Sequence, residues 1–187
     1  GERGVARRRV ERVNEVAVTA VGADRPGIVA ALTGALLDVG GNLEDARAAL
    51  LRGSFAMVMV VAVPDGTGPA EVERALRPVA AELGLGLWVG PAAPAAPGPL
   101  RPRCVVSVYG ADRPGIVHGV TAALAARGVN VVDLSARLVG DPPLYVLGIE
   151  VEPPAEMGAD EVRAALRPTA EGLGVELAVE AEEDEVL

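Results

Sequence analysis

The stretch Gly22-Ala-Asp-Arg-Pro-Gly-Ile-Val29 recurs without change as Gly110-Ala-Asp-Arg-Pro-Gly-Ile-Val117, 88 positions further along the chain. Matches continue at this offset beyond the octapeptide, since Asn42 corresponds to Asn130. In the second half of each copy the offset rises to 90, which places two extra residues near positions 140–143. Collinear matches of this kind are typical of an internal duplication. The sequence therefore predicts two copies of one structural unit.

Each copy contains the same order of strand and helix patterns. Apolar residues three and four positions apart predict a helix that begins at the Pro-Gly of the octapeptide, with Pro26 in its first position. A second helix is predicted from Pro69 to Gly84, and Pro78 and Pro168 fall inside the second helices, where we expect a tolerated kink. Strands are predicted over residues 15–21, 42–51, 55–63 and 85–89, and over 104–109, 130–139, 144–151 and 175–179.

This βαββαβ order predicts an α+β protein with two ferredoxin-like domains, each an antiparallel four-stranded sheet with both helices on one face. We expect the first domain over residues 14–90 and the second over 103–180. The proline-rich segment 91–102 favours an extended, semi-rigid linker. Residues 1–13 are expected to form a basic tail, and residues 181–187 an acidic one.

The composition argues against several classes of function. The net charge is −9, and nucleic acid needs a cationic surface, so we expect no direct contact with nucleic acid. The single cysteine, Cys104, excludes an internal disulfide and suits a reducing cytoplasm. No apolar run reaches the length of a membrane span, and we expect a cytoplasmic protein without membrane contact.

No constellation of residues predicts catalysis, a metal or a cofactor. The only histidine, His118, falls on the opposite side of its predicted helix from Ile116 and has Ala30 as its counterpart, which favours a surface position. Cys104 has no titratable partner nearby in the sequence. Paired histidine ligands, a phosphate-binding loop and a nucleophile elbow are all lacking from the sequence. We therefore expect a protein that is not an enzyme.

The strand predicted over residues 55–63 is apolar on both faces. A sheet that is covered on one side only should alternate apolar with polar residues. The pattern predicts that the second face is covered as well, either by the other copy or by another chain.

The Gly-Ala-Asp-Arg-Pro-Gly-Ile-Val motif, the helix that ends in glycine, and the asparagine heading the next strand together resemble the ACT domain family. Two such units, with Asn42-Leu-Glu-Asp45 in one and Asn130-Val-Val-Asp133 in the other, resemble the group of glycine cleavage system transcriptional repressors. The resemblance implies βαββαβ modules that bind amino acids and regulate metabolism. It also implies that a ligand lies between the octapeptide loop of one domain and strands of its neighbour.

The candidate ligand site is the start of the first helix in each copy. Helix N-termini present free amides and a positive partial charge, and glycine lets a ligand approach the backbone closely. A carboxylate is expected against the amides of residues 27–28 or 115–116, while an asparagine side chain across the top of the sheet offers a carbonyl to the ammonium group. The candidate residues are Asp24, Arg25, Gly27, Ile28 and Asn42 in the first copy, and Asp112, Arg113, Gly115, Ile116 and Asn130 in the second.

Structural interpretations of the same residues remain open. Gly, Pro and Asp also suit a tight turn between strand and helix. Asp24 and Asp112 are equally suited to cap the helix, and Arg25 and Arg113 to be merely solvated.

The functional hypothesis is a regulator that senses an amino acid such as glycine and acts through protein–protein contact, and we expect a homodimer. The protein partner would be a transcription regulator or an enzyme. Two alternatives remain: a regulatory region or partner of an enzyme of serine or folate metabolism, and a dimerisation module without a ligand.

Overall fold

The computed structural model describes residues 14–93 and 102–182, and the chain divides into two compact units near residue 95. The predicted basic tail 1–13, residues 183–187 of the predicted acidic tail, and the centre of the predicted linker lie outside the described residues. Ala181, where the acidic tail was expected to begin, is the last residue of a strand. None of the described helices is long and apolar enough to cross a membrane.

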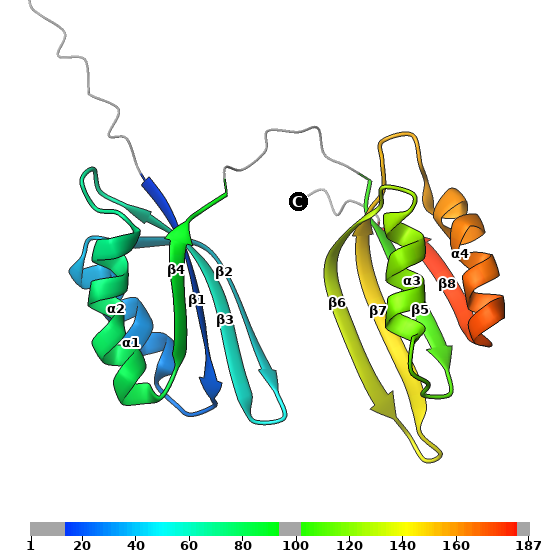
Figure 1. Cartoon of the computed structure of the whole chain (residues 1–187), viewed down its shortest axis with the longest axis horizontal. Coiled ribbons are helices and arrows are strands. Elements are labelled where there is room, and N and C mark those ends of the chain that lie inside the picture. Colours follow the sequence, from blue (N-terminus) through cyan, green and yellow to red (C-terminus); the bar gives the residue numbers. More distant parts are fainter. Residues whose placement is uncertain (1–13, 94–101, 183–187) are drawn as a thin grey trace, which may run out of the picture. The chain divides into compact units, whose positions relative to one another are not determined.

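Unit 1 is an antiparallel sheet with two helices on one face (Figure 1). Its strand order is β2-β3-β1-β4, and β2 and β4 are therefore the edges. In chain order the elements are β1 (Asn14–Ala23), α1 (Ile28–Asp38), β2 (Asn42–Leu51), β3 (Ser54–Val63), α2 (Pro69–Leu83) and β4 (Gly86–Pro91).

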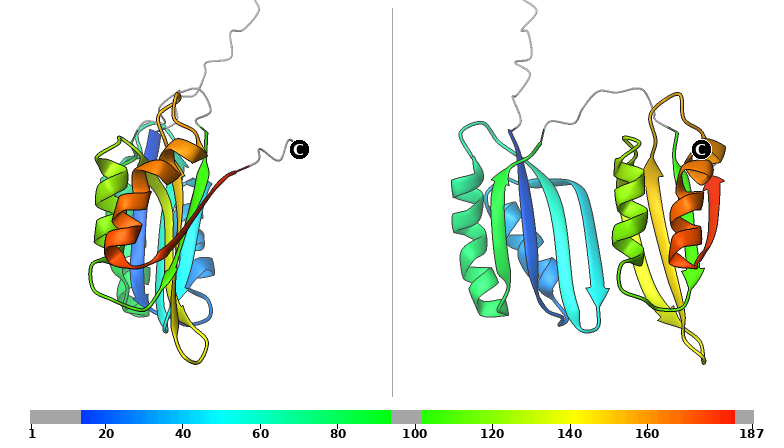
Figure 2. Two further views of the ribbon diagram at one scale, coloured as in Figure 1. Left: turned by 90° about the vertical axis from the view of Figure 1, so that its right-hand side faces the viewer. Right: turned by 45° about the vertical axis from the view of Figure 1, so that its right-hand side comes forward.

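Unit 2 repeats this arrangement with the strand order β6-β7-β5-β8. Its helices again lie on one face of its own sheet (Figure 2). The elements are β5 (Cys104–Gly110), α3 (Ile116–Ala125), β6 (Asn130–Val139), β7 (Leu144–Glu152), α4 (Ala159–Leu173) and β8 (Glu176–Ala181). The two ferredoxin-like units of the α+β class that the sequence predicted are confirmed.

The core of each unit lies between the helices and the inner face of the sheet. In unit 1, Val18 of β1 pairs with Met59 of β3, and both are fully buried beneath Leu32 of α1 and Leu76 of α2. Small branched side chains suit such a thin layer because they pack well against a pleated surface. Alternate residues of the same strands form the outer face of the sheet.

The two extra residues of the second copy lie in a hairpin, as expected. Arg52 and Gly53, at φ 47° and 82°, form a two-residue turn between β2 and β3. The equivalent turn between β6 and β7 contains the four residues 140–143.

The helices agree with the sequence-based expectation except at the start of the first one. Pro26 is not the first residue of a helix, because α1 begins at Ile28 and Gly27 is its N-cap residue. As expected, Pro78 and Pro168 lie inside α2 and α4, which each continue over 15 residues.

Candidate functional site

The first helix of each unit begins at a glycine in a left-handed conformation. Gly27 has φ 94° and ψ −8°, and Gly115 has φ 96° and ψ −8°. These values are strained for residues with a side chain, which explains why the octapeptide has glycine there. No side chain caps either helix, and neither first turn contains an acidic residue.

The space beside this helix start is open. A Cβ atom placed on Gly27 or Gly115 would meet no heavy atom within 4 Å. The carbonyl of Gly27 accepts the amide of Ala31 at 2.9 Å within the helix. Among the described residues, none of the hydrogen bonds in turns, loops and caps is donated by the amide of Gly27 or Ile28. These amides are therefore placed to donate to a bound anion.

The second helix of each unit, unlike the first, has an acidic side chain bound at its N-terminus. Glu71, in the first turn of α2, accepts the amide of the N-cap residue Gly68 at 3.0 Å, and Glu161 does the same for Gly158 in α4. The hydrogen bond from Gly68 lowers the pKa of the Glu71 carboxyl. The protein thus supplies its own anion at the start of α2 and α4, but not at the start of α1 and α3.

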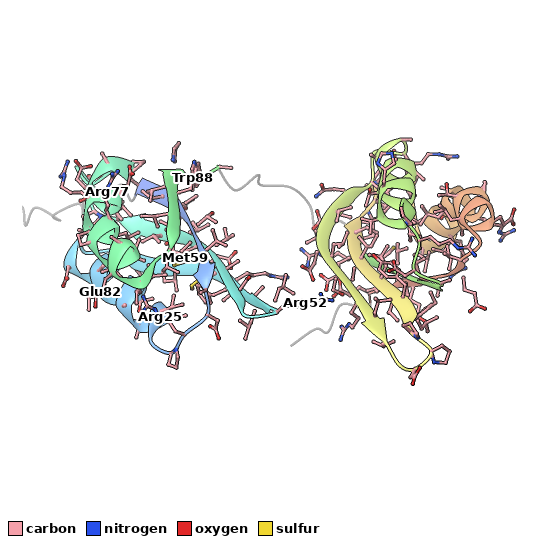
Figure 3. All side chains as sticks on the ribbon, turned by 60° about the horizontal axis from the view of Figure 1, so that its bottom comes forward. Arg25, Arg52, Met59, Arg77, Glu82 and Trp88 are labelled. Atoms are coloured by element: carbon pink, nitrogen blue, oxygen red, sulfur yellow. The ribbon has the colours of Figure 1, made fainter. Side chains whose placement is uncertain are left out.

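Asp24 and Arg25 both hold the loop in place. The amide of Asp24 donates to the carbonyl of Gly53 at 2.8 Å, which ties the loop to the β2–β3 hairpin. Arg25 donates from Nη2 to the carbonyl of Glu82 at 2.7 Å, near the C-terminal end of α2 (Figure 3). Arginine there satisfies a free carbonyl and complements the negative end of the helix dipole. The capping role considered for Asp24 is wrong, because Gly27 is the N-cap residue and no side chain caps α1.

Unit 2 shares only part of this arrangement. A Cβ atom on Gly174, the residue that ends α4, would lie 3.6 Å from Nη1 of Arg113, so this arginine also reaches the end of the second helix. Asp112 is exposed and does not cap α3, whose N-cap residue is Gly115. In the described part of unit 2, no main-chain hydrogen bond joins residue 112 to the longer hairpin turn.

The structure separates the asparagines from these loops. Ala23, at the end of β1, pairs with Ser54, whereas Asn42 pairs with Ala62 at the other end of β3. A strand of ten residues is about 30 Å long, far more than the length of an amino acid. The pairing of Asn130 with Glu152 repeats this placement in unit 2. The expectation that an asparagine lies across the sheet top from the loop of its own unit is therefore wrong.

Sequence reasoning did not find the partners that position the loop. Glu82 lies 57 residues from Arg25, and nothing local relates the two positions. The turn at Arg52-Gly53 can be predicted from the sequence as a break between two strands. The contact of its Gly53 carbonyl with the amide of Asp24 cannot.

The remaining reactive side chains form no catalytic arrangement in the described residues. His118 is exposed on α3. Cys104 is buried at the start of β5, and its burial raises the pKa of the thiol. The parts of the chain that the structure describes contain no group of three His, Cys, Asp or Glu residues able to hold a metal ion.

The fold and the repeated helix start are those of a tandem regulatory module, and the chain belongs to the ACT domain family, whose model matches residues 14–89 and 103–180. It is similar to the glycine cleavage system transcriptional repressor of Escherichia coli K12, with 36% identity over 121 residues. That match covers 64% of this chain and 63% of the relative, so it spans less than two thirds of the relative's length.

Two further proteins are similar to this chain, one over part of it and one over nearly all of it. A UPF0237 protein of Methanopyrus kandleri is 36% identical over 81 residues, which cover 43% of this chain and 89% of the relative. A solved structure of an unknown protein from Galdieria sulphuraria has a TM-score of 0.79 and 30% identity, and the match covers 92% of this chain and all of that one. Because the match covers 89% of the Methanopyrus kandleri protein, that short protein contains little more than one such unit.

Proposed function

We propose that this protein is an amino-acid-responsive regulator in which the carboxylate of the ligand binds the free amides at the start of α1 or α3. One observation carries the proposal: the protein closes the N-termini of α2 and α4 with its own glutamates and leaves those of α1 and α3 open. A carboxylate ligand supplies at the open ends the interaction that Glu71 and Glu161 supply at the closed ones.

The asparagines would contribute from a different unit. Because Asn42 lies at the end of the sheet opposite to the loop of its own unit, with about 26 Å of β3 between their pairing partners, a ligand that touches both an open helix start and an asparagine must lie between two units. Pairing within a chain or in a homodimer supplies such a neighbour. Ligand binding then changes the association of units, and association is a physical route from binding to regulation.

Glycine is the first ligand to test, because the Escherichia coli relative is named for the glycine cleavage system. A regulator with a net charge of −9 is poorly suited to bind DNA directly, because the phosphate backbone is itself negatively charged. Action on transcription therefore proceeds through a protein partner whose affinity changes with the ligand. An enzyme as that partner fits the same site equally well.

Thermal melting of the whole chain against the twenty amino acids tests the proposal. A ligand at a hundred times its dissociation constant adds about 2.7 kcal/mol, which raises Tm by about 11–22 °C in a domain of this size. Asn42→Ala and Asn130→Ala should abolish the shift and leave the unliganded Tm nearly unchanged, since both side chains are exposed. A dimeric protein that responds to none of the twenty would instead be the ligand-free dimerisation module.

A further inference from the structure

A hollow of about 350 Å³ lies in unit 1 between the end of α1 and the first turns of α2. Its lining residues are Val39, Thr67, Glu71, Arg74 and Ala75. The start of β1 borders this hollow, because Asn14 donates from Nδ2 to the carbonyl of Thr67 at 3.2 Å. Residues 1–13 therefore join the described part of the chain beside the hollow.

The end of α1 beside this hollow lacks a cation. Asp38 is the last residue of the helix, and the last turn contains no basic residue. The C-terminal end of a helix is negative, because its last carbonyls have no partner within the helix, so a cation stabilises it and a carboxylate does not. Asp38 is exposed and forms no ion pair with any residue in the described ranges 14–93 and 102–182. This end of α1 therefore favours positive charge.

Unit 2 provides this positive charge from its own sequence. At the offset of 88, Asp38 corresponds to an alanine and Val39 to Arg127, which directly follows the C-cap residue of α3. The residue before β5, Arg103, also forms an ion pair at 3.0 Å with Glu152, the last residue of β7. Unit 1 has an arginine at neither of the two equivalent positions.

We propose that the basic segment of residues 7–13 packs across the hollow of its own chain and places Arg12 beside Asp38 at the end of α1. The segment contains four arginines and one glutamate, so it is complementary in charge to this end of the helix. Asp65 lies two residues before Thr67, which lines the hollow, and adds a second exposed carboxylate. The segment thus supplies to α1 the positive charge that unit 2 carries within its own fold.

The direction of β1 favours this placement of Arg12. Side chains alternate between the two faces along a strand. Val18 is buried beneath the helices, and Asn14, four residues earlier, contacts the loop before α2, so both point to the helix side of the sheet. An extended continuation of β1 turns residue 12 to the same side.

The end of α1 is also within reach of the segment. Asn14 pairs with Val63 on the neighbouring strand, and the next residue, Pro64, lies against the turn after α1, since a Cβ atom on Gly40 would be 3.0 Å from its Cγ. One strand spacing and one such contact put this turn roughly 10 Å from Asn14. Two extended residues span about 7 Å, and the long side chain of Arg12 covers the remainder.

Trp88 is the only tryptophan of the chain and belongs to β4, so its emission follows the unfolding of unit 1. Replacing the arginines of the segment by serine (Arg7→Ser, Arg8→Ser, Arg9→Ser and Arg12→Ser together) should lower the Tm measured in this way by about 3–6 °C at low ionic strength. The loss should be less than half as large in about 1 M salt, where the screening length falls to about 3 Å. An unchanged Tm at low ionic strength would overturn the proposal.

A variant that carries the residues of unit 2, Asp38→Ala with Val39→Arg, is the matched control. Its first helix has a cation of its own, so the four serine replacements should leave its Tm almost unchanged. An equal loss of Tm in both backgrounds would mean that the arginines act elsewhere on the protein, and the proposal would be wrong.

Amide NMR spectra of the original chain and of the serine variant locate the contact. We expect differences at residues 38–41 and at Thr67, and none at Gly27 and Ile28, which lie at the other end of α1. Unmoved amides at residues 38–41 would contradict the proposal, as would differences that vanish on dilution, because the segment of a second copy would then occupy the hollow. These outcomes are independent of the amino acid panel, because the candidate ligand site lies at the start of α1.

Discussion

Replacing Gly27 by alanine separates the backbone role of this residue from its role in binding. Gly27 has φ 94°, a conformation that costs a residue with a side chain about 1–2 kcal/mol. Alanine also restricts the unfolded chain, which offsets about 0.5 kcal/mol of this cost. The added methyl group meets no heavy atom within 4 Å, so no steric cost is added. The net loss is about 1 kcal/mol, or about 4–8 °C in the Tm of unit 1.

The effect on binding should be larger than the effect on stability, because the methyl group occupies the open space in which the carboxylate is expected. Gly66→Ala is the matched control: Gly66 has φ 88° and equally open surroundings, but it lies in the turn after β3. Both variants should lose similar stability in calorimetry, and only Gly27→Ala should lose the ligand-induced shift in Tm. Equal ligand shifts in the two variants would show that the carboxylate does not bind at Gly27.

Three further outcomes follow from the described contacts. Arg25→Met removes the donor to the carbonyl near the end of α2 and should lower the free energy of unfolding by up to about 1 kcal/mol in urea titrations, whereas Arg25→Lys should lose less. The pKa of Glu71 is lowered in the folded state, so its stabilisation is complete above the unfolded value of 4.5 and is lost as the pH falls below it. Glu71→Gln should therefore flatten the acid limb of a plot of Tm against pH. Cys104 is buried with a raised pKa, and a thiol reagent at pH 8 should label it only when unit 2 unfolds.

Much of the fold could be predicted because its determinants are local. The repeated octapeptide, the helical spacing and the glycines after each helix gave both units and the boundaries of most elements to within two residues. The error at Pro26 also had a local cause, since proline suits the first helical position but here the left-handed Gly27 intervenes.

The site was harder to predict because its geometry depends on strand direction and on distant partners. Asn42 follows α1 closely in the sequence, but α1 carries the chain back along the sheet and leaves Asn42 at the far end from Gly27. The contact of Arg25 with Glu82 joins positions far apart in the chain. The sequence therefore indicated where the first helix of each unit starts. The residues that contact this helix start could be identified only from the structure.

The proposed function requires that the amides at the start of α1 and α3 donate to the carboxylate of a ligand. An amide-resolved NMR titration of the full chain with glycine, and with the strongest stabiliser of the melting panel, measures this directly. We expect saturable shifts that are largest at Gly27 and Ile28 or at Gly115 and Ile116, with little change at Gly68 and Gly158. Saturable binding that leaves the amides of residues 27–28 and 115–116 unmoved would contradict it.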